Sequence, residues 1–292
     1  MPQLFLKRAC AWIALFSLCA CSAPSLNRSD RIKVVTSIST FNSFVSAVGG
    51  SHVVVTSLVP IGASPETYQP TPENVATLAR AQILVENGAG LESWLDRTVK
   101  NAGSSSLRIV TGTDGLKIIN QNPHLWMDPQ YAKNYVRKIR DALMRVDPSH
   151  AYEYRKNAGK YSRTLDALTR SIARRFADIP AQRRYMIVFH NAWQYYNDRF
   201  GITTLGFIEQ NPGEDPNPQQ IARLIDLAKL HRVRAIFSEP EYSPKLARQI
   251  AHDAGISIVD DLYDDSIGTG RYARDYISML NYDTGVIVKS MQ

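Results

Sequence analysis

Two histidines and one aspartate stand where a divalent metal ion could be bound. His124 lies in the octet Asn-Pro-His-Leu-Trp-Met-Asp-Pro at 122–129, between two prolines that restrict the backbone, and Trp126 can anchor this loop to a core. His190 directly follows an apolar, strand-like run, and Asp265 follows the last expected strand. Imidazole and carboxylate groups are the usual ligands of zinc, manganese and iron, so these residues predict a metal site.

Each of these residues also has a structural interpretation. A histidine at a strand end is commonly a hydrogen-bonded core residue, and Asp265 stands among several aspartates that could form an ordinary polar loop. Asp128 is expected to orient its own loop or to cap the helix that begins near Gln130. The remaining histidines lack comparable settings and are interpreted as structural or surface residues: His52, His150, His231 and His252.

Short apolar, β-branched runs alternate with segments of helical periodicity through most of the chain. Strands are expected at 32–36, 52–59, 82–85, 107–110, 185–189, 203–208, 233–237 and 256–259. Helices are expected at 41–48, 73–80, 91–102, 131–146, 192–200, 218–230, 244–254 and 272–288. This βα alternation predicts an α/β fold with mainly parallel sheets, in which ligands bind beyond the carboxyl ends of the strands.

Residues 148–180 interrupt the alternation with a long polar stretch that carries apolar residues at helical spacing. One helix of about 30 residues would span roughly 45 Å. We therefore expect two similar α/β lobes, at 32–147 and 181–292, joined by one long rigid helix at 148–180. The predicted metal site lies in the cleft between the lobes.

The N-terminus has the features of a secretory signal: a basic start, an apolar run too short to span a membrane, and small residues. Leu-Cys-Ala-Cys at 18–21 resembles the bacterial lipobox, so we expect a lipoprotein signal peptide at 1–21, lipidation of Cys21 and a polar tether at 22–31. The alternative is an ordinary signal peptide cut a few residues later. All three cysteines lie in 1–21, which excludes disulfides and thiolate ligands from the folded part.

The net charge of +7 comes from basic residues scattered among acidic ones, as on solvated helix faces. No nucleic-acid partner is expected, because no recognised motif accompanies the charge. A basic balance also suits a protein tethered beside an anionic membrane.

A series of motifs, in this order, resembles one family over essentially all of 32–290. The motifs are Pro-x-Thr-Tyr-x-Pro-Thr-Pro at 65–72, Glu-Asn-Gly-Ala-Gly-Leu-Glu-Ser-Trp-Leu at 86–95, Pro-His-Leu-Trp-Met-Asp-Pro at 123–129, His-Asn-Ala-Trp-Gln-Tyr-Tyr at 190–196, Phe-Ser-Glu-Pro at 237–240 and Asp-Ser-Ile at 265–267. The family comprises the metal-binding extracytoplasmic lipoproteins of bacterial ABC importers for zinc, manganese or iron(II), called cluster A-I. The resemblance implies small lobe movements about a rigid helix.

The resemblance implies four metal ligands, which are Glu66, His124, His190 and Asp265. The first is normally the histidine of Pro-His-x-Tyr-x-Pro, and this sequence has Glu66 there. Either Glu66 binds, giving two imidazoles and two carboxylates, or it points away and water completes a three-ligand site. Binding is favoured, because the surrounding motif is kept.

The resemblance implies a binding protein and not an enzyme: an extracytoplasmic, lipid-anchored monomer that hands one divalent metal ion, as cargo, to an ABC permease in the membrane. Mn²⁺ or Fe²⁺ is favoured by the oxygen ligands and by the short segment 112–122, which lacks the histidine-rich loop of many zinc members. Zn²⁺ comes next, since it ranks above Mn²⁺ in the Irving–Williams order.

Two other functions are alternatives for this sequence. A metal-dependent hydrolase could use three ligands, water and Glu66 as general base, but no His-Glu-x-x-His or Gly-x-Ser-x-Gly is present. A surface adhesin on the same fold is the third, and no apolar stripe or repeat supports it.

Overall fold

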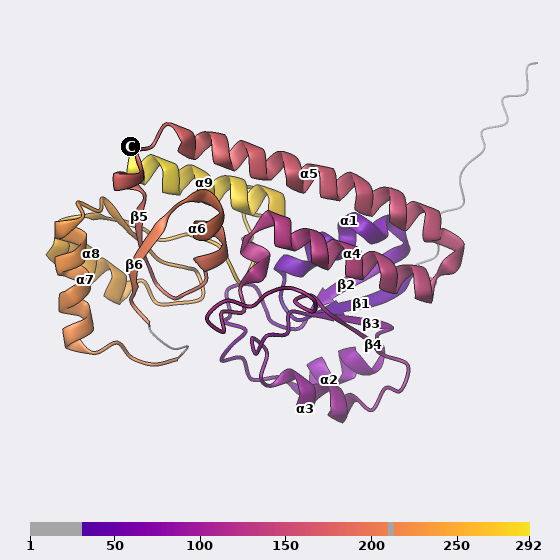
Figure 1. Ribbon diagram of the computed structural model, residues 1–292. Helices are drawn as coiled ribbons and strands as arrows, with labels where there is room; N and C mark the ends of the chain where they lie inside the picture. The colour runs from indigo at the N-terminus through magenta and orange to yellow at the C-terminus, as the bar shows by residue number, and fades with distance from the viewer. Residues whose placement is uncertain (1–30, 210–212) are drawn as a thin grey trace, which may run out of the picture.

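The computed structural model describes residues 31–209 and 213–292 (Figure 1). The predicted signal peptide 1–21, the lipidation site Cys21 and the tether up to residue 30 lie outside the described residues. Within the described ranges, no helix combines the length and the apolar character needed to cross a membrane.

The first lobe is built on a four-stranded parallel sheet in the order β2-β1-β3-β4. The strands are β1 (Ile32–Thr36), β2 (Val53–Ser57), β3 (Ile83–Glu86) and β4 (Arg108–Thr111). Helices α1 (Thr40–Gly49) and α4 (Pro129–Val146) cover one face, while α2 (Pro72–Ala79) and α3 (Leu95–Ala102) cover the other (Figure 1).

Alternate residues of the central strands enter two different apolar clusters, as the two-residue period of a strand requires. In β3, Ile83 and Val85 face the cluster under α1 and α4, whereas Leu84 faces the cluster under α2 and α3. A strand buried on both faces reads as a continuous apolar run, which explains why this segment was recognisable in the sequence.

The second lobe holds two parallel strand pairs, β5–β6 and β7–β8, with β5 next to β7. Its strands are β5 (Tyr185–Val188), β6 (Thr203–Phe207), β7 (Ala235–Phe237) and β8 (Ser257–Val259). Its helices are α6 (Gln194–Phe200), α7 (Pro218–Leu230) and α8 (Lys245–Ala254). The predicted α/β class with parallel strands is confirmed. The structure adds that the strands of this lobe form two separate hydrogen-bonded pairs instead of one continuous sheet.

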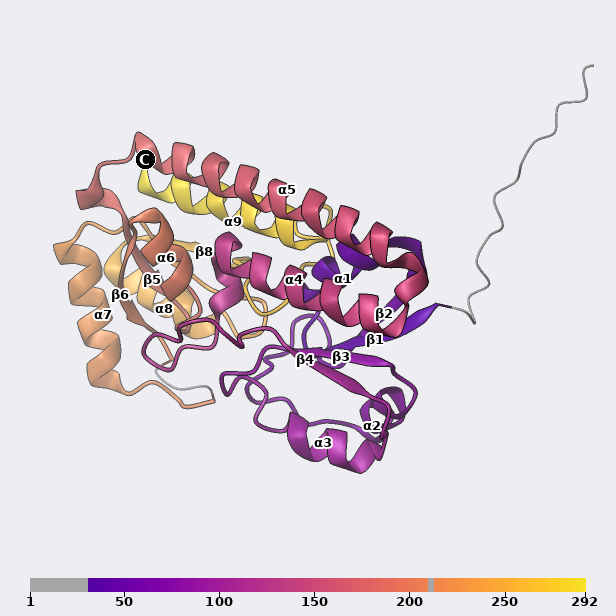
Figure 2. The same cartoon turned by 45° about the vertical axis from the view of Figure 1, so that its right-hand side comes forward.

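The long helix α5 (Ala151–Ala177) has 27 residues, which gives a length of about 40 Å. The C-terminal helix α9 (Tyr276–Met291) runs beside it and also reaches α1 of the first lobe (Figure 2). One apolar cluster therefore contains residues from both lobes and from both long helices. The expected lobe boundaries at residues 147 and 180 fall near the ends of α4 and α5. They stay predictions, because the shared apolar cluster contains residues from both sides of each boundary.

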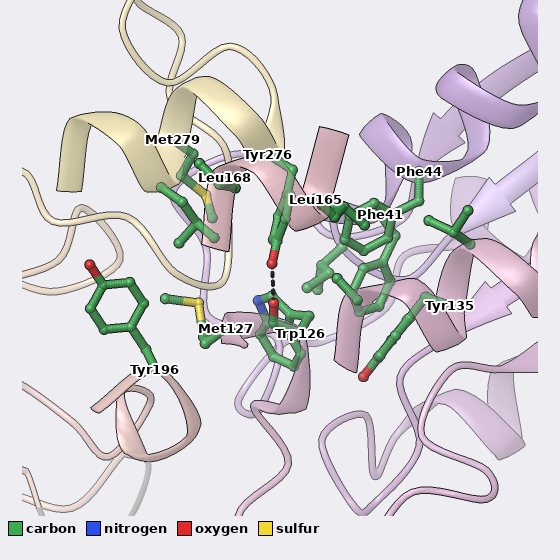
Figure 3. Close-up of a cluster of buried hydrophobic side chains, with 14 of the residues drawn as sticks. Phe41, Phe44, Trp126, Met127, Tyr135, Leu165, Leu168, Tyr196, Tyr276 and Met279 are labelled. Carbon is green, nitrogen blue, oxygen red and sulfur yellow. Dashed lines mark hydrogen bonds between the residues drawn. The ribbon is translucent and has the colours of Figure 1, made fainter. Parts of the chain in front are cut away.

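Trp126 lies at the centre of that shared core (Figure 3). Its ring meets Phe41 of α1 edge-on, with ring centroids 5.5 Å apart, and its carbonyl oxygen accepts a 2.5 Å hydrogen bond from the Tyr276 hydroxyl of α9. The predicted anchoring of the 122–129 loop by Trp126 is confirmed, since this side chain is fully buried.

Asp128 ends this loop and begins α4, as expected for a capping residue. Its Oδ1 accepts a 2.8 Å hydrogen bond from the backbone N–H of Gln130. Its Oδ2 forms a 2.6 Å ion pair with Arg199 of α6 in the other lobe. One carboxylate therefore caps the helix and also connects the two lobes.

The junction between α4 and α5 depends on the carboxylate of Asp147. Burial raises the pKa of Asp147, but hydrogen bonds from Ser149, Tyr154 and His150 outweigh this and lower it to about 2. A folded-state pKa below the ordinary 3.8 stabilises the fold above about pH 4, and this contribution is lost as the pH falls towards 2.

We expect Asp147→Asn to lower the free energy of unfolding by about 1–2 kcal/mol at pH 7, because the hydrogen bonds to a charged acceptor are lost. The difference from wild type should shrink as the pH falls from 7 to 3. Urea unfolding at several pH values measures it, with the exposed Asp226→Asn as the control. An unchanged midpoint for Asp147→Asn would contradict the assignment.

Candidate metal centre

The ring of His124 is held in one orientation by Asn122. The amide oxygen of Asn122 accepts hydrogen bonds from the backbone N–H of His124 at 2.9 Å and from its Nδ1 at 3.0 Å. Because an amide oxygen can only accept, Nδ1 carries the proton and Nε2 keeps its lone pair. The ring packs against Trp126, and only 2% of the side chain is exposed.

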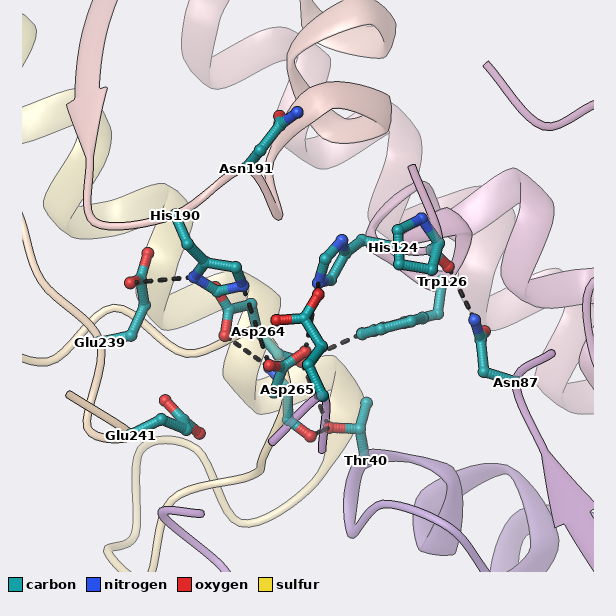
Figure 4. A network of polar contacts seen from close by, with 12 residues as sticks. Thr40, Asn87, His124, Trp126, His190, Asn191, Glu239, Glu241, Asp264 and Asp265 are labelled. Carbon is teal, nitrogen blue, oxygen red and sulfur yellow. Dashed lines mark hydrogen bonds and ion pairs between the residues drawn. The ribbon is translucent and has the colours of Figure 1, made fainter. Parts of the chain in front are cut away.

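His190 lies two residues beyond the end of β5 and is held from the opposite side. Its Nδ1 lies 3.2 Å from Glu239 Oε2 and 3.9 Å from Asp264 Oδ2, so these carboxylates keep the proton on Nδ1 (Figure 4). Its Nε2 then faces Asp265, whose Oδ2 lies 3.8 Å away. A carboxylate behind a histidine is the usual way to orient the free nitrogen of a metal ligand.

Asp265 lies between the two imidazoles and is fully buried. Its Oδ1 is 3.5 Å from His124 Nε2, while its Oδ2 faces His190. The loop that carries it is fixed to the first lobe, because the Thr40 hydroxyl donates to the Asp265 carbonyl at 3.3 Å and the Trp126 indole donates to the Asp264 carbonyl at 3.0 Å (Figure 4).

Glu66 also points into this cluster. Its Oε1 lies 4.0 Å from His124 Nε2, and 14% of its side chain is exposed. It is thus more exposed than His124, His190 or Asp265, and it stands on the outer side of the group. The structure brings together all four residues that the family resemblance implied as ligands.

The ligand atoms of the cluster lack hydrogen-bond partners among the described residues. The atoms concerned are Glu66 Oε2, His124 Nε2, His190 Nε2 and both carboxylate oxygens of Asp265. Buried polar atoms without partners are rare and destabilising. A bound cation would satisfy all of them at once.

Burial and neighbouring charges also shift the pKa values of the ionisable groups in the cluster. Burial raises the pKa of Glu66, and burial together with the charge of Glu239 raises the pKa of Asp264 well above its ordinary value. Burial lowers the pKa of His190, but Asp264 and Glu239 outweigh it, so that the pKa is well above 6.5. Without an ion, the cluster retains protons that a divalent cation would displace.

The distances fit a single ion. Ligand atoms bound at about 2.1 Å in a tetrahedral site lie about 3.4 Å from one another. Three pairs here, each between an imidazole Nε2 and a carboxylate oxygen, measure 3.5, 3.8 and 4.0 Å. Shifts of a few tenths of an ångström would bring these atoms onto one ion, so the group of His124, His190 and Asp265 is preformed.

The sequence did not single out Glu239 or Glu241 for a role. Glu239 follows β7 as His190 follows β5, so its place at the carboxyl end of a parallel strand was the available signal. Glu241 accepts a hydrogen bond from Ser266, and burial together with the charge of Asp265 raises its pKa to about 8. The described structure thus surrounds the cluster with more carboxylates than the expected two.

A second histidine group lies apart from this centre. His52 and His150 stack with ring centroids 3.9 Å apart and an interplanar angle of 27°, beside Asp147. The rings lie in nearly parallel planes, and His150 already has a carboxylate partner, with its Nδ1 2.6 Å from Asp147 Oδ2. His52 instead contacts Glu153 at 2.9 Å, which agrees with its structural interpretation.

We expect Glu66→Gln to stabilise the metal-free protein. An acid whose pKa is raised on folding destabilises the folded state above its ordinary pKa of 4.5, and a neutral amide removes this cost. Urea unfolding at pH 7 with excess chelator should show a gain of about 1 kcal/mol. The exposed Glu73→Gln is the control, and a loss of stability for Glu66→Gln would contradict the expectation.

Comparison with known proteins gives consistent similarities. Residues 34–290 match the family model described as "Zinc-uptake complex component A periplasmic", ZnuA. The manganese-binding lipoprotein MntA of Halalkalibacterium halodurans is 32% identical over 90% of this chain and 89% of its own length. The iron-binding protein YfeA of Yersinia pestis is 30% identical over 98% of this chain and 96% of its own length.

Solved structures agree with this. A crystal structure of ZnuA superposes with a TM-score of 0.83 at 26% identity, covering 90% of this chain and all of that one. The Mn-bound periplasmic metal binding protein from Candidatus Liberibacter asiaticus gives a TM-score of 0.80 at 27% identity, with the same coverage of 90% and 100%.

Proposed function

Since the chain belongs to the ZnuA family of periplasmic zinc-uptake components, we propose that it is the solute-binding protein of an ABC importer that captures one divalent transition metal. The ligands in this proposal are Glu66, His124, His190 and Asp265. The observation that carries it is their convergence: three buried side chains and the partly exposed Glu66 direct unpaired ligand atoms towards one position.

The ligand set favours Mn²⁺ or Fe²⁺, with Zn²⁺ next. Two carboxylates supply up to four oxygens beside two imidazole nitrogens, and harder ions with higher coordination numbers prefer oxygen. The relatives whose names specify a metal include a manganese-binding and an iron-binding protein. Zn²⁺ stays a candidate cargo because it binds such sites more tightly than Mn²⁺ in the Irving–Williams order.

The arrangement suggests how the ion is released to a permease. Glu66 and His124 belong to the first lobe, and His190 and Asp265 to the second. A small relative shift of the lobes on docking would separate the two pairs of ligands and weaken the site. We place the protein outside the cytoplasmic membrane, as a monomer anchored by lipid at Cys21, in keeping with relatives named as lipoproteins.

Catalysis is not part of the proposal. A hydrolytic zinc site keeps a position open for water beside three protein ligands. Here a fourth side chain, Glu66, points to the same position from the outer side. It is therefore assigned as a ligand and not as a general base, and the hydrolase and adhesin alternatives are not favoured.

Metal content and competition binding test the proposal on residues 22–292, with Mn²⁺, Fe²⁺ and Zn²⁺ under anaerobic conditions. We expect one ion per chain, and at least tenfold weaker binding for Glu66→Ala, which corresponds to about 1.4 kcal/mol. Glu66→His should shift the preference towards Zn²⁺, and Glu73→Ala should change nothing. The proposal fails if the wild type binds no ion tightly and only Glu66→His does.

The affinity for the metal ion should decrease as the pH is lowered, because protons compete with the ion for the same ligand atoms. Glu66 and His190 have raised pKa values in the metal-free protein, so each retains its proton at a higher pH than usual. Between pH 7.5 and 5.5 we expect the dissociation constant to rise by more than about tenfold. A dissociation constant that stays the same over this range would exclude these side chains as ligands.

A further inference from the structure

The turn that carries Glu66 is tied to α3 by a single side chain. The indole N–H of Trp94, at the start of α3, donates a 2.7 Å hydrogen bond to the carbonyl oxygen of Pro65. Pro65 directly precedes Glu66, is buried, and has no N–H of its own, so its carbonyl is its only backbone hydrogen-bonding group. The hydrogen bond therefore fixes the peptide unit from which Glu66 projects.

Little else holds this turn. Among the described residues, the Trp94 bond is the one hydrogen bond made by positions 64–67, and the Glu66 carboxylate accepts none. The ring of Tyr68 adds an edge-on contact to Trp94, with ring centroids 5.2 Å apart. Trp94 thus contacts the chain on both sides of Glu66.

Trp94 itself is well supported on one side and open on the other. Its carbonyl oxygen accepts a 3.1 Å hydrogen bond from the hydroxyl of the buried Thr98, one turn along α3. Its side chain also borders a groove of about 700 Å³, whose walls include Pro70, Val75 and the exposed Arg97. The side chain of Trp94 is therefore reachable from the surface.

Glu66 needs such support more than the other ligands do. His124 is oriented by Asn122, and His190 by Glu239, through direct hydrogen bonds to their rings. Among residues 31–209 and 213–292, no hydrogen bond orients the Glu66 carboxylate in a comparable way, so its direction depends on the backbone of its turn. The position of that backbone depends on the indole of Trp94.

We infer that Trp94 is a positioning residue for Glu66, which holds the carboxylate in place to retain the metal ion. This inference rests on the proposed function. When the indole N–H is removed or drawn away from Pro65, the Glu66 turn loosens, and the ion leaves faster while the other three ligands stay in place.

A double-mutant cycle tests this with Mn²⁺ as the probe, on wild type, Trp94→Phe, Glu66→Ala and the double variant. Competition titration gives the dissociation constants, and a chelator chase gives the dissociation rates. Trp94→Phe should weaken binding about fivefold, the size expected for one lost hydrogen bond, and mainly by faster dissociation. In the Glu66→Ala background the same change should have no further effect.

The outcomes are distinct. If Trp94→Phe weakens binding equally with and without Glu66, Trp94 is only structural and the inference is overturned. If wild type and Trp94→Phe bind alike, the inference also fails while the proposed function stands. If wild type binds no ion, the proposed function itself fails.

A second measurement needs no substitution that perturbs folding. In the metal-bound wild-type protein, exchange of the Trp94 indole N–H with solvent should be slowed by its bond to Pro65, even though this side chain is partly exposed. Exchange at the rate of a free indole would overturn the inference. The Arg97→Ala variant serves as a matched control, since it changes the groove wall without touching the hydrogen bond.

Discussion

The burial of ligand atoms without partners is the constraint on which the rest of the structure depends. Two imidazole nitrogens, both carboxylate oxygens of Asp265 and one of Glu66 are removed from water and have no hydrogen-bond partner among the described residues. Such an arrangement is unfavourable by itself, and like-charged carboxylates nearby make it more so. It persists only because the surrounding fold holds each group in place, and a divalent cation would relieve both costs together.

The apolar core shared by the two lobes holds these groups in place. Trp126 fills the centre of an apolar cluster to which both lobes and helices α5 and α9 contribute, and its indole fixes the Asp264 carbonyl beside Asp265 (Figures 3 and 4). Thr40 of α1 supports the same loop from the first lobe. Because packed cores deform little, ligands contributed by different lobes stay at fixed separations unless the lobes themselves move.

A second set of polar groups decides how the ligands point. Asn122 and Glu239 each bind the Nδ1 side of a histidine, which leaves Nε2 free for an ion. Trp94 acts indirectly, through its hydrogen bond to the backbone carbonyl of Pro65, which precedes Glu66. The four expected ligands are therefore held in different ways. His124 and His190 are fixed through hydrogen bonds to their rings, Asp265 lies within a buried loop, and Glu66 is positioned through the backbone of its turn.

The sequence by itself determined the local features of this protein. Apolar periodicity located the strands and helices, and the prolines and Trp126 around His124 marked a fixed loop, because these signals act between neighbours in the chain. The positions of His190 and Asp265 at strand ends predicted that they meet, since parallel strands end at one edge of a sheet. The tertiary structure decided what depends on distant contacts. That Glu66 points inward, that Glu239 and Asp264 flank His190, and that one core joins the lobes all follow from packing between segments far apart in sequence, which no local pattern encodes.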